Sequence, residues 1–275
     1  MTSVALPHQA LGTLLRGWRQ RRHLSQLALA LEADISQRHL SFIESGRARP
    51  KREMVLHIAQ HLDVPLRERN HLLLAAGYAP VFPERTLDDP ALDAVRGAVD
   101  MVLKGHEPYP ALAIDRHWRL LAANAAVPQL LIGVDASLLE APVNVLRLSL
   151  HPQGLAPRIV NFAEWRGHVL DRVRRQVDAS ADIVLIQLLR ELSDYPVPAR
   201  QPTSSAVATR SRSVRPHTAA GVFVPLQLET DAGVLSFLST TTVFGTPADI
   251  TVSELALECF YPADAATAEL LRSAR

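Results

Sequence analysis

The polar residues that follow Ser36 have side chains suited to the edges of nucleic-acid bases. Gln37, Arg38 and His39 are consecutive in the segment SQRHLSFIE. A glutamine amide matches the donor and acceptor of adenine, and an arginine fork matches the two acceptors of guanine. We therefore take these three residues as candidates for base contacts.

Hydroxyl, amide and guanidinium groups around the same segment are suited to phosphate oxygens. The candidates for phosphate contacts are Gln26, Ser36, Ser41, Arg47 and Arg49. A purely structural interpretation is also open, in which Ser36 only caps a helix and the two arginines only belong to a solvated loop. The spacing of the surrounding apolar residues favours the first interpretation.

That spacing is found in residues 26–43, QLALALEADISQRHLSFI. Two helices that cross steeply over a short turn need a small residue at the crossing, a residue that tolerates the turn, and three buried anchors. The residues at those positions are Ala30, Asp34, Ile35, Leu40 and Ile43. The sequence therefore predicts a helix-turn-helix whose second helix exposes the candidates for base contacts.

With these residues the segment resembles the DNA-binding domain of the Xre, or lambda-repressor-like, regulators. The resemblance covers about residues 11–77 and includes SQRHLSFIESGRARP. It departs from the family pattern at the turn, where glycine is usual and this chain has Asp34, a residue type that tolerates the left-handed conformation. The resemblance also implies that Arg19 and Glu44 pair inside the domain and do not read DNA.

Five short helices are predicted to build this N-terminal domain, which we assign to residues 1–79 and expect to be all-α. Ser25 and Ser36 are suited to begin the second and third helices. Gly46 and Gly77 are suited to end the third and fifth. Prolines at 80, 83 and 90 mark residues 80–90 as a linker.

Residues 91–275 read as an α+β domain. PALAID, WRLLAAN and ELALECFYP are predicted strands, and VFVPLQLE-TDAG-VLSFLSTTTVF predicts a hairpin with Gly233 at its turn. Residues 143–190 are predicted to be largely helical, and residues 196–216, rich in Pro, Ser, Thr and Arg, to form an exposed loop.

This region resembles the ligand-binding domain of MmyB-like regulators, a PAS-like fold, in PALAIDRHWRLLAANAA, LHPQGLAPRIVNFAEWRGH, LSFLSTTTVFGTPADIT and ELALECFYPADAATAELL. The resemblance implies a sensor that holds a small apolar ligand, such as a fatty acid, between a sheet and its helices. It also implies that Asn124 caps a helix.

Four residues in or beside apolar helices are candidates for ligand contacts: Arg147, His151, Arg158 and Trp165. Either arginine is able to neutralise a carboxylate head group. The alternative is that the arginines are solvated and that Trp165 belongs to the core.

The sequence contains no clear signal for catalysis, metal binding or a reactive thiol. HExxH, GxSxG, P-loop and GxGxxG motifs are absent, so we expect no catalytic residues and no enzyme activity. His57 and His61 are four residues apart on a predicted helix, but no third ligand is apparent, so no metal site is predicted. Cys259 is the single cysteine, and its alternation with Leu255 and Leu257 predicts a buried position.

Charge is unevenly distributed along the chain. Residues 1–80 hold 11 basic and 6 acidic residues, whereas the remainder holds 18 and 22. A basic segment suits a phosphate backbone. With neither a signal peptide nor a long apolar run expected, we predict a cytoplasmic homodimer that binds double-stranded DNA, with no role at a membrane.

The prediction is thus a transcriptional regulator controlled by a small apolar effector, with no other cofactor. Two alternatives remain open at this point. One is a DNA-binding adaptor whose C-terminal domain serves only dimerisation or partner docking. The other is an enzyme with a DNA-binding appendage.

Overall fold

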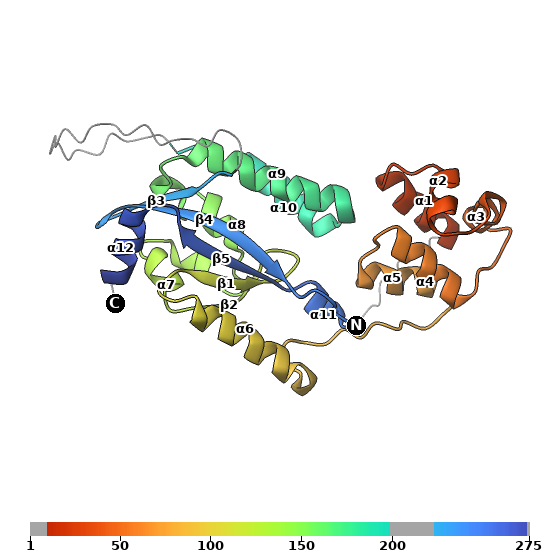
Figure 1. Ribbon diagram of the computed structural model, residues 1–275. Coiled ribbons are helices and arrows are strands. Elements are labelled where there is room, and N and C mark those ends of the chain that lie inside the picture. Colours follow the sequence, from red (N-terminus) through yellow and green to blue (C-terminus); the bar gives the residue numbers. More distant parts are fainter. Residues whose placement is uncertain (1–9, 199–222, 274–275) are drawn as a thin grey trace. The chain divides into compact units, whose positions relative to one another are not determined.

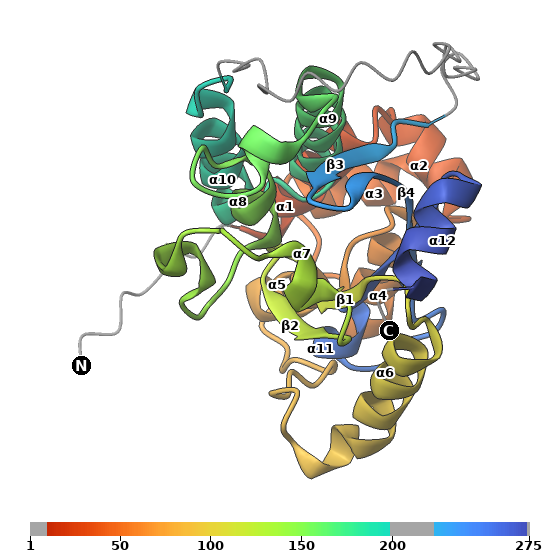
Figure 2. The same cartoon turned by 90° about the vertical axis from the view of Figure 1, so that its left-hand side faces the viewer.

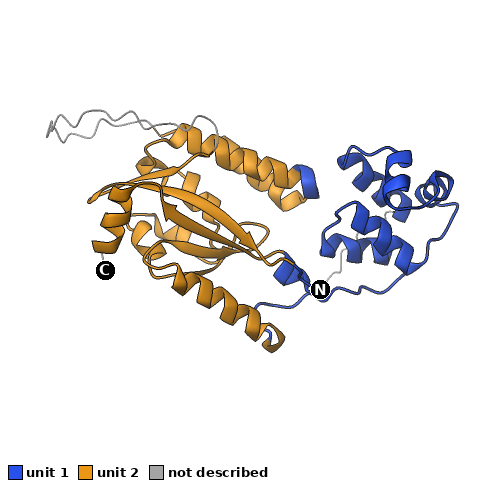
Figure 3. Cartoon of the chain, viewed as in Figure 1, with its two compact units in different colours: residues 1–89, 178–180, 246–253 blue, residues 90–177, 181–245, 254–275 orange. Residues whose placement is uncertain are grey.

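The computed structural model describes residues 10–198 and 223–273, in which the chain forms two compact units (Figure 3). The first unit comprises residues 1–89, 178–180 and 246–253, and the second comprises 90–177, 181–245 and 254–275. Most of the proposed linker therefore belongs to the first unit.

Five consecutive helices form the bulk of the first unit, as the sequence predicted (Figure 1). They are α1 (Leu11–Arg21), α2 (Gln26–Glu32), α3 (Gln37–Glu44), α4 (Arg52–His61) and α5 (Leu66–Ala75). Each helix buries a large aliphatic residue in one shared core: Leu15, Leu29, Leu40, Ile58 and Leu72. Burial of each such side chain contributes about 1.5–3 kcal/mol.

The predicted helix boundaries of this unit are confirmed at the caps. The Ser25 and Ser36 hydroxyl oxygens accept hydrogen bonds from backbone N–H groups in the first turns of α2 and α3, at 3.0 and 3.1 Å. Gly46 and Gly77 follow the ends of α3 and α5 with φ of +74° and +83°. Asp34 has φ +48° in the turn between α2 and α3, the left-handed conformation expected there.

A close approach of α1 to α3 also shapes the unit. A Cβ atom at Gly12 would lie 2.2 Å from the carbonyl oxygen of Glu44, so only glycine fits at this position without a shift. Ala30, also buried, lies at the predicted crossing of α2 and α3. The sequence pattern identified Ala30 but gave no reason to single out Gly12.

A five-stranded antiparallel sheet organises the described part of the second unit, in the order β2-β1-β5-β4-β3. The strands are β1 (Ala111–Ile114), β2 (Leu120–Ala123), β3 (Leu226–Thr230), β4 (Gly233–Val243) and β5 (Ala256–Pro262). β1 lies near the start of the unit and β5 near its end. Because these two strands pair, the two ends of the unit are held together in one sheet. The α+β fold and the hairpin of β3 and β4, with Gly233 at φ +130°, are as predicted.

Helices cover both faces of this sheet (Figures 1 and 2). α6 (Asp93–Gly105) packs on one face, and α8 (Val145–Leu150), α9 (Phe162–Ser180) and α10 (Ile183–Asp194) pack on the other. The alternation along β1 explains the two cores, since Leu112 and Ile114 face the larger one and Ala111 and Ala113 the smaller. Short helices α7 (Val127–Leu130) and α12 (Ala265–Ser273) complete the unit, with 3₁₀ turns at Pro90–Leu92, Ala136–Leu139 and Ala156–Arg158.

Two predictions about single residues of this unit have opposite outcomes. Cys259 is buried with Leu255 and Leu257, as expected. The predicted helix-capping role of Asn124 is wrong, because α7 begins at Val127 with Ala126 as its N-cap.

Asn124 instead joins three pieces of backbone. Its side-chain oxygen accepts from Ala111 N at 3.1 Å, and its amide donates to the carbonyl oxygens of Leu103 and Tyr109 at 3.1 and 2.8 Å. Because the side chain is buried, these bonds tie the end of α6 and the start of β1 to the end of β2. The predicted loop at 196–216 lies outside the described residues from residue 199 onward.

The segment 246–253, which joins β4 to β5, packs within the first unit. It contains α11 (Ile250–Ser253). Ile250 N donates to the carbonyl oxygen of Pro83 at 2.9 Å, and Arg85 forms an ion pair with Asp249 at 2.7 Å. The Thr251 hydroxyl donates to the carbonyl oxygen of Arg85. No helix among the described residues has the length and apolar character needed to cross a membrane.

Candidate nucleic-acid interface and ligand cavity

The first turn of α3 exposes the residues predicted to contact bases. Leu40 and Ile43 are fully buried on one side of the helix. Gln37 and Arg38 are exposed and His39 is half-buried, so the polar side chains after Ser36 are free of the core. Each can therefore donate to or accept from an external partner.

Phe42 organises two of the predicted DNA contacts. The guanidinium carbon of Arg38 lies 5.3 Å from the Phe42 ring centroid, and that of Arg47 lies 5.9 Å from it. Arg47 N also donates to the carbonyl oxygen of Phe42 at 2.8 Å, which folds the loop after α3 back onto the helix. Sequence reasoning missed Phe42, although its position four residues after Arg38 on a helix was a readable signal.

Glu44 is the centre of a buried polar network. Arg19 donates to both carboxylate oxygens, at 2.7 and 2.9 Å, which confirms the predicted internal pairing. Gln26 donates to the same carboxylate at 2.8 Å, so the nitrogen of its amide takes part in this internal network. Burial alone would raise the pKa of Glu44, but the hydrogen bonds from Arg19 and Gln26 outweigh it and hold that pKa below its ordinary value.

The structure brings all eight predicted DNA contacts onto two helices and one loop. Gln26 begins α2, and Ser36 caps α3. Ser41 is half-buried on α3, whereas Arg47 and Arg49 are exposed in the loop that leads to α4. The group thus lies at the start of α2, on α3 with its cap, and in the loop that follows α3.

An apolar cavity of about 110 Å³ lies inside the second unit, between the sheet and α9. Leucine, valine and aromatic side chains from β1, β2, β3, β5, α7, α8 and α9 form most of its wall. Such a lining with a few polar groups is typical of sites for small apolar ligands.

Of the four residues predicted to contact a ligand, Trp165 lines this cavity and the other three do not. The Trp165 indole donates to Ser149 Oγ at 2.8 Å. Arg147 forms a bidentate pair with Glu191, with both hydrogen bonds at 2.7 Å. His151 accepts a hydrogen bond from the backbone of Gln153, and Arg158 donates to backbone carbonyls beside a separate hollow.

The charged groups at the cavity are ones that sequence reasoning missed: His168 and Arg172 on α9, and Glu258 on β5. Glu258 is only 4% exposed. A charged residue within the apolar run of a strand buried on both faces was the signal that could have identified it, because such a carboxylate needs a buried partner. His168 and Arg172 are one helical turn apart and so share a face of α9.

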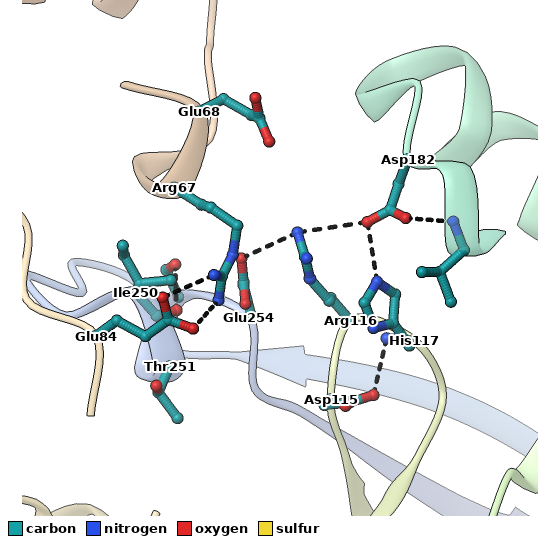
Figure 4. A network of polar contacts seen from close by, with 12 residues as sticks. Arg67, Glu68, Glu84, Asp115, Arg116, His117, Asp182, Ile250, Thr251 and Glu254 are labelled. Atoms are coloured by element: carbon teal, nitrogen blue, oxygen red, sulfur yellow. Dashed lines mark hydrogen bonds and ion pairs between the residues drawn. The ribbon is translucent and has the colours of Figure 1, made fainter. Parts of the chain in front are cut away.

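His117, which appeared isolated in the sequence, belongs to a polar network at the turn between β1 and β2 (Figure 4). Its Nε2 atom lies 2.9 Å from a carboxylate oxygen of Asp182, the residue that caps α10. Arg116 lies 3.4 Å from the same carboxylate and 3.6 Å from that of Glu254. Burial would raise the pKa of Asp182, but the hydrogen bond from His117 and its other partners lower it. This network holds the turn against α10.

The histidine pair on α4 has a structural contact of its own. His57 Nε2 lies 2.6 Å from the carbonyl oxygen of Ala33, and its ring packs edge-on against His61. Within residues 10–198 and 223–273, no three His, Cys, Asp or Glu side chains are grouped so as to hold a metal ion.

Together the helical unit and the α+β unit with its cavity define a DNA-binding transcriptional regulator that carries a ligand-binding domain. Residues 10–72 match a helix-turn-helix domain, and residues 95–274 match the MmyB-like transcription regulator ligand binding domain. Because the second match spans more than half of the chain, the protein belongs to the MmyB-like transcription regulators. Both matches are to domains of regulators and not of enzymes. No curated protein matches the chain.

Proposed function

We propose that this regulator binds a roughly palindromic operator as a homodimer, with half-sites about one helical turn or a small multiple apart. A small ligand with an apolar chain, the class that includes fatty acids, occupies the cavity and alters DNA binding. The observation that carries the proposal is the apolar cavity beside α9 in a chain whose α3 presents free polar side chains.

The lining of the cavity supports an apolar chain as the ligand. Its volume of about 110 Å³ is of the same order as the roughly 150 Å³ of an engineered apolar cavity that stays dry and binds benzene. A ligand changes DNA binding only if it binds one arrangement of the regulator more tightly than another. Ligand control therefore predicts two states with different affinity for the operator.

Filling the cavity tests this proposal. Val169 is buried on α9 and lines the cavity. We expect Val169→Phe to remove any co-purified ligand and the response of DNA binding to it, while operator binding itself persists. The readouts are mass spectrometry of extracted small molecules and titration of operator fragments obtained by genome-wide mapping of bound sites.

Val102→Phe is the matched control, because Val102 is exposed on α6 and does not line the cavity. This variant should keep both the ligand and the response. If wild-type protein contains no ligand and its DNA binding ignores small apolar molecules, the C-terminal domain serves only dimerisation or partner docking. Purified protein that fails to prefer any duplex from its genome would contradict DNA recognition as well.

A further inference from the structure

Polar side chains meet at one part of the cavity wall, and we call this group the polar cluster: His168, Arg172, Ser239, Thr241 and Glu258. Ser239 and Thr241 lie on one face of β4, and in the register of the sheet Thr241 is directly opposite Glu258. His168 and Arg172 belong to α9, which packs over this face. All of them except Thr241 line the cavity itself.

The two charges of the polar cluster already neutralise each other. Arg172 donates to both carboxylate oxygens of Glu258, and the Thr241 hydroxyl donates to the same carboxylate at 2.7 Å. The Arg172 guanidinium also lies over the Trp118 ring, 4.5 Å from its centroid. Arg172 is therefore held by a carboxylate and a ring, and it does not present a free positive charge to a ligand.

The groups left for a ligand in the polar cluster are uncharged. Burial, followed by the nearby charges of Arg172 and Arg175, lowers the pKa of His168, which favours a neutral imidazole. The His168 ring stacks on Trp165 at 5.7 Å, and within the described part of the chain neither its ring nitrogens nor the Ser239 hydroxyl is hydrogen-bonded. Together they offer hydrogen-bond donors and acceptors without net charge.

We propose that the ligand is an amphiphile with an uncharged head group, such as a hydroxyl, ester or amide, which hydrogen-bonds to His168 and Ser239. This inference rests on the ligand control proposed above and narrows its ligand class. A free carboxylate is disfavoured, because Arg172 is already neutralised and the Glu258 carboxylate repels a second negative charge nearby.

Two probes of equal chain length test the head group on the full chain after removal of bound lipid. Calorimetric titration at pH 7.5 compares 1-octanol with octanoate, which is ionised at that pH. We expect wild-type protein to bind octanol at least about tenfold more tightly than octanoate. Val169→Phe should abolish binding of both probes, which shows that they enter the cavity.

Removing the negative charge of Glu258 should reduce or abolish the preference for octanol over octanoate. In Glu258→Gln the Arg172 guanidinium loses its carboxylate, so we expect octanoate to bind at least about tenfold more tightly than it binds wild-type protein. Glu229→Gln is the control, since it removes one negative charge at an exposed position that does not line this cavity. If Glu258→Gln does not fold, Ser239→Ala tests the head-group assignment instead. We expect this variant to bind octanol more weakly than wild-type protein and to bind octanoate with unchanged affinity.

The outcomes separate the two proposals. If octanoate binds wild-type protein as tightly as octanol, or if Glu258→Gln and Ser239→Ala leave the ratio of the two affinities unchanged, the head-group assignment is wrong and ligand control stands. If folded wild-type protein binds neither probe, ligand control fails and the head-group assignment with it.

Discussion

Phe42 lies beside two arginines whose sequence positions suggest different roles on DNA. The sequence predicts that Arg38 reads a base and that Arg47 contacts a phosphate, and the guanidinium groups of both lie near the Phe42 ring. A guanidinium held over an aromatic face samples fewer conformations, and each conformation removed before binding lowers the entropy lost on binding. Phe42 therefore restricts the side chains of two predicted DNA contacts without itself needing to touch DNA.

Removing Arg38 should weaken recognition at one base. We expect Arg38→Ala to reduce binding to the operator by about 1–3 kcal/mol and to relax the preference at one position, because a bidentate contact is lost. Competitive binding to a library of operator variants measures both effects. Arg272→Ala removes an equal charge from α12 of the second unit and should leave the preference intact. An unchanged preference in Arg38→Ala would mean that this arginine does not read a base.

Arg49 should act through charge and not through sequence. This residue is exposed in the loop after α3, and a phosphate contact there releases counterions on binding. We expect Arg49→Ala to weaken binding to all duplexes and to reduce the slope of log affinity against log salt concentration by about 0.9. Titrations between low and moderate salt provide the slope. A loss confined to one base position would assign Arg49 to readout instead.

At the level of elements, the contact of α1 with α3 depends on the absence of a side chain at Gly12. Alanine normally favours a helix over glycine by about 0.8–1.0 kcal/mol. At Gly12, however, the new methyl group would overlap the backbone of Glu44 and Ile43. We expect Gly12→Ala to destabilise the protein by about 1–3 kcal/mol, the usual effect of overpacking, as measured by denaturant unfolding.

Gly17 in the same helix is the matched control. A Cβ atom there meets nothing nearer than a guanidinium nitrogen of Arg21 at 3.7 Å. Gly17→Ala should therefore follow helix propensity and stabilise the protein by up to about 1 kcal/mol. Equal effects of the two substitutions would show that the approach of α1 to α3 relaxes freely.

The elements were largely predictable because their signals are local. Serine caps, helical periodicity and the glycine at the hairpin turn each act within a few residues, and the structure has them where expected. Asn124 was misread because an asparagine that caps a helix and one that joins a helix end to two strands have the same local sequence. Gly12 was missed for a related reason, since its constraint comes from a helix about thirty residues away.

The residues that line the cavity were less predictable than the side chains that α3 exposes. A helix-turn-helix lies in one short segment, so spacing alone predicts which of its side chains are buried and which are exposed. The cavity draws its wall from elements between β1 and β5. Arg147 and Arg172 both have an apolar neighbour on a helix, and only the tertiary arrangement decides that Arg172 lines the cavity while Arg147 pairs with Glu191.

At the scale of the whole molecule, the segment between β4 and β5 connects the cavity wall to residues 83–85, which precede the second unit. β5 carries Glu258 and Phe260, which line the cavity. The residues that precede β5 form α11, whose segment is bonded to Pro83 and Arg85. If a ligand displaces β5, the strand transmits that displacement to these bonds, because a hydrogen-bonded strand moves largely as a unit.

Removing bonds between the segment 246–253 and Arg85 should reduce the effect of the ligand on operator binding. In Arg85→Gln combined with Thr251→Ala, the ion pair to Asp249 and the hydroxyl bond to the Arg85 carbonyl are both lost. We expect the affinities for operator alone and for octanol alone to stay within about twofold of wild type, since neither site is touched. The ratio of operator affinities with and without octanol should move toward one, because coupling is a free energy of about 1–3 kcal/mol that depends on the connection between sites. Arg174→Gln, which breaks an exposed pair with Asp171 on α9, should leave that ratio unchanged. A ratio that survives the double substitution would place the connection elsewhere in the chain.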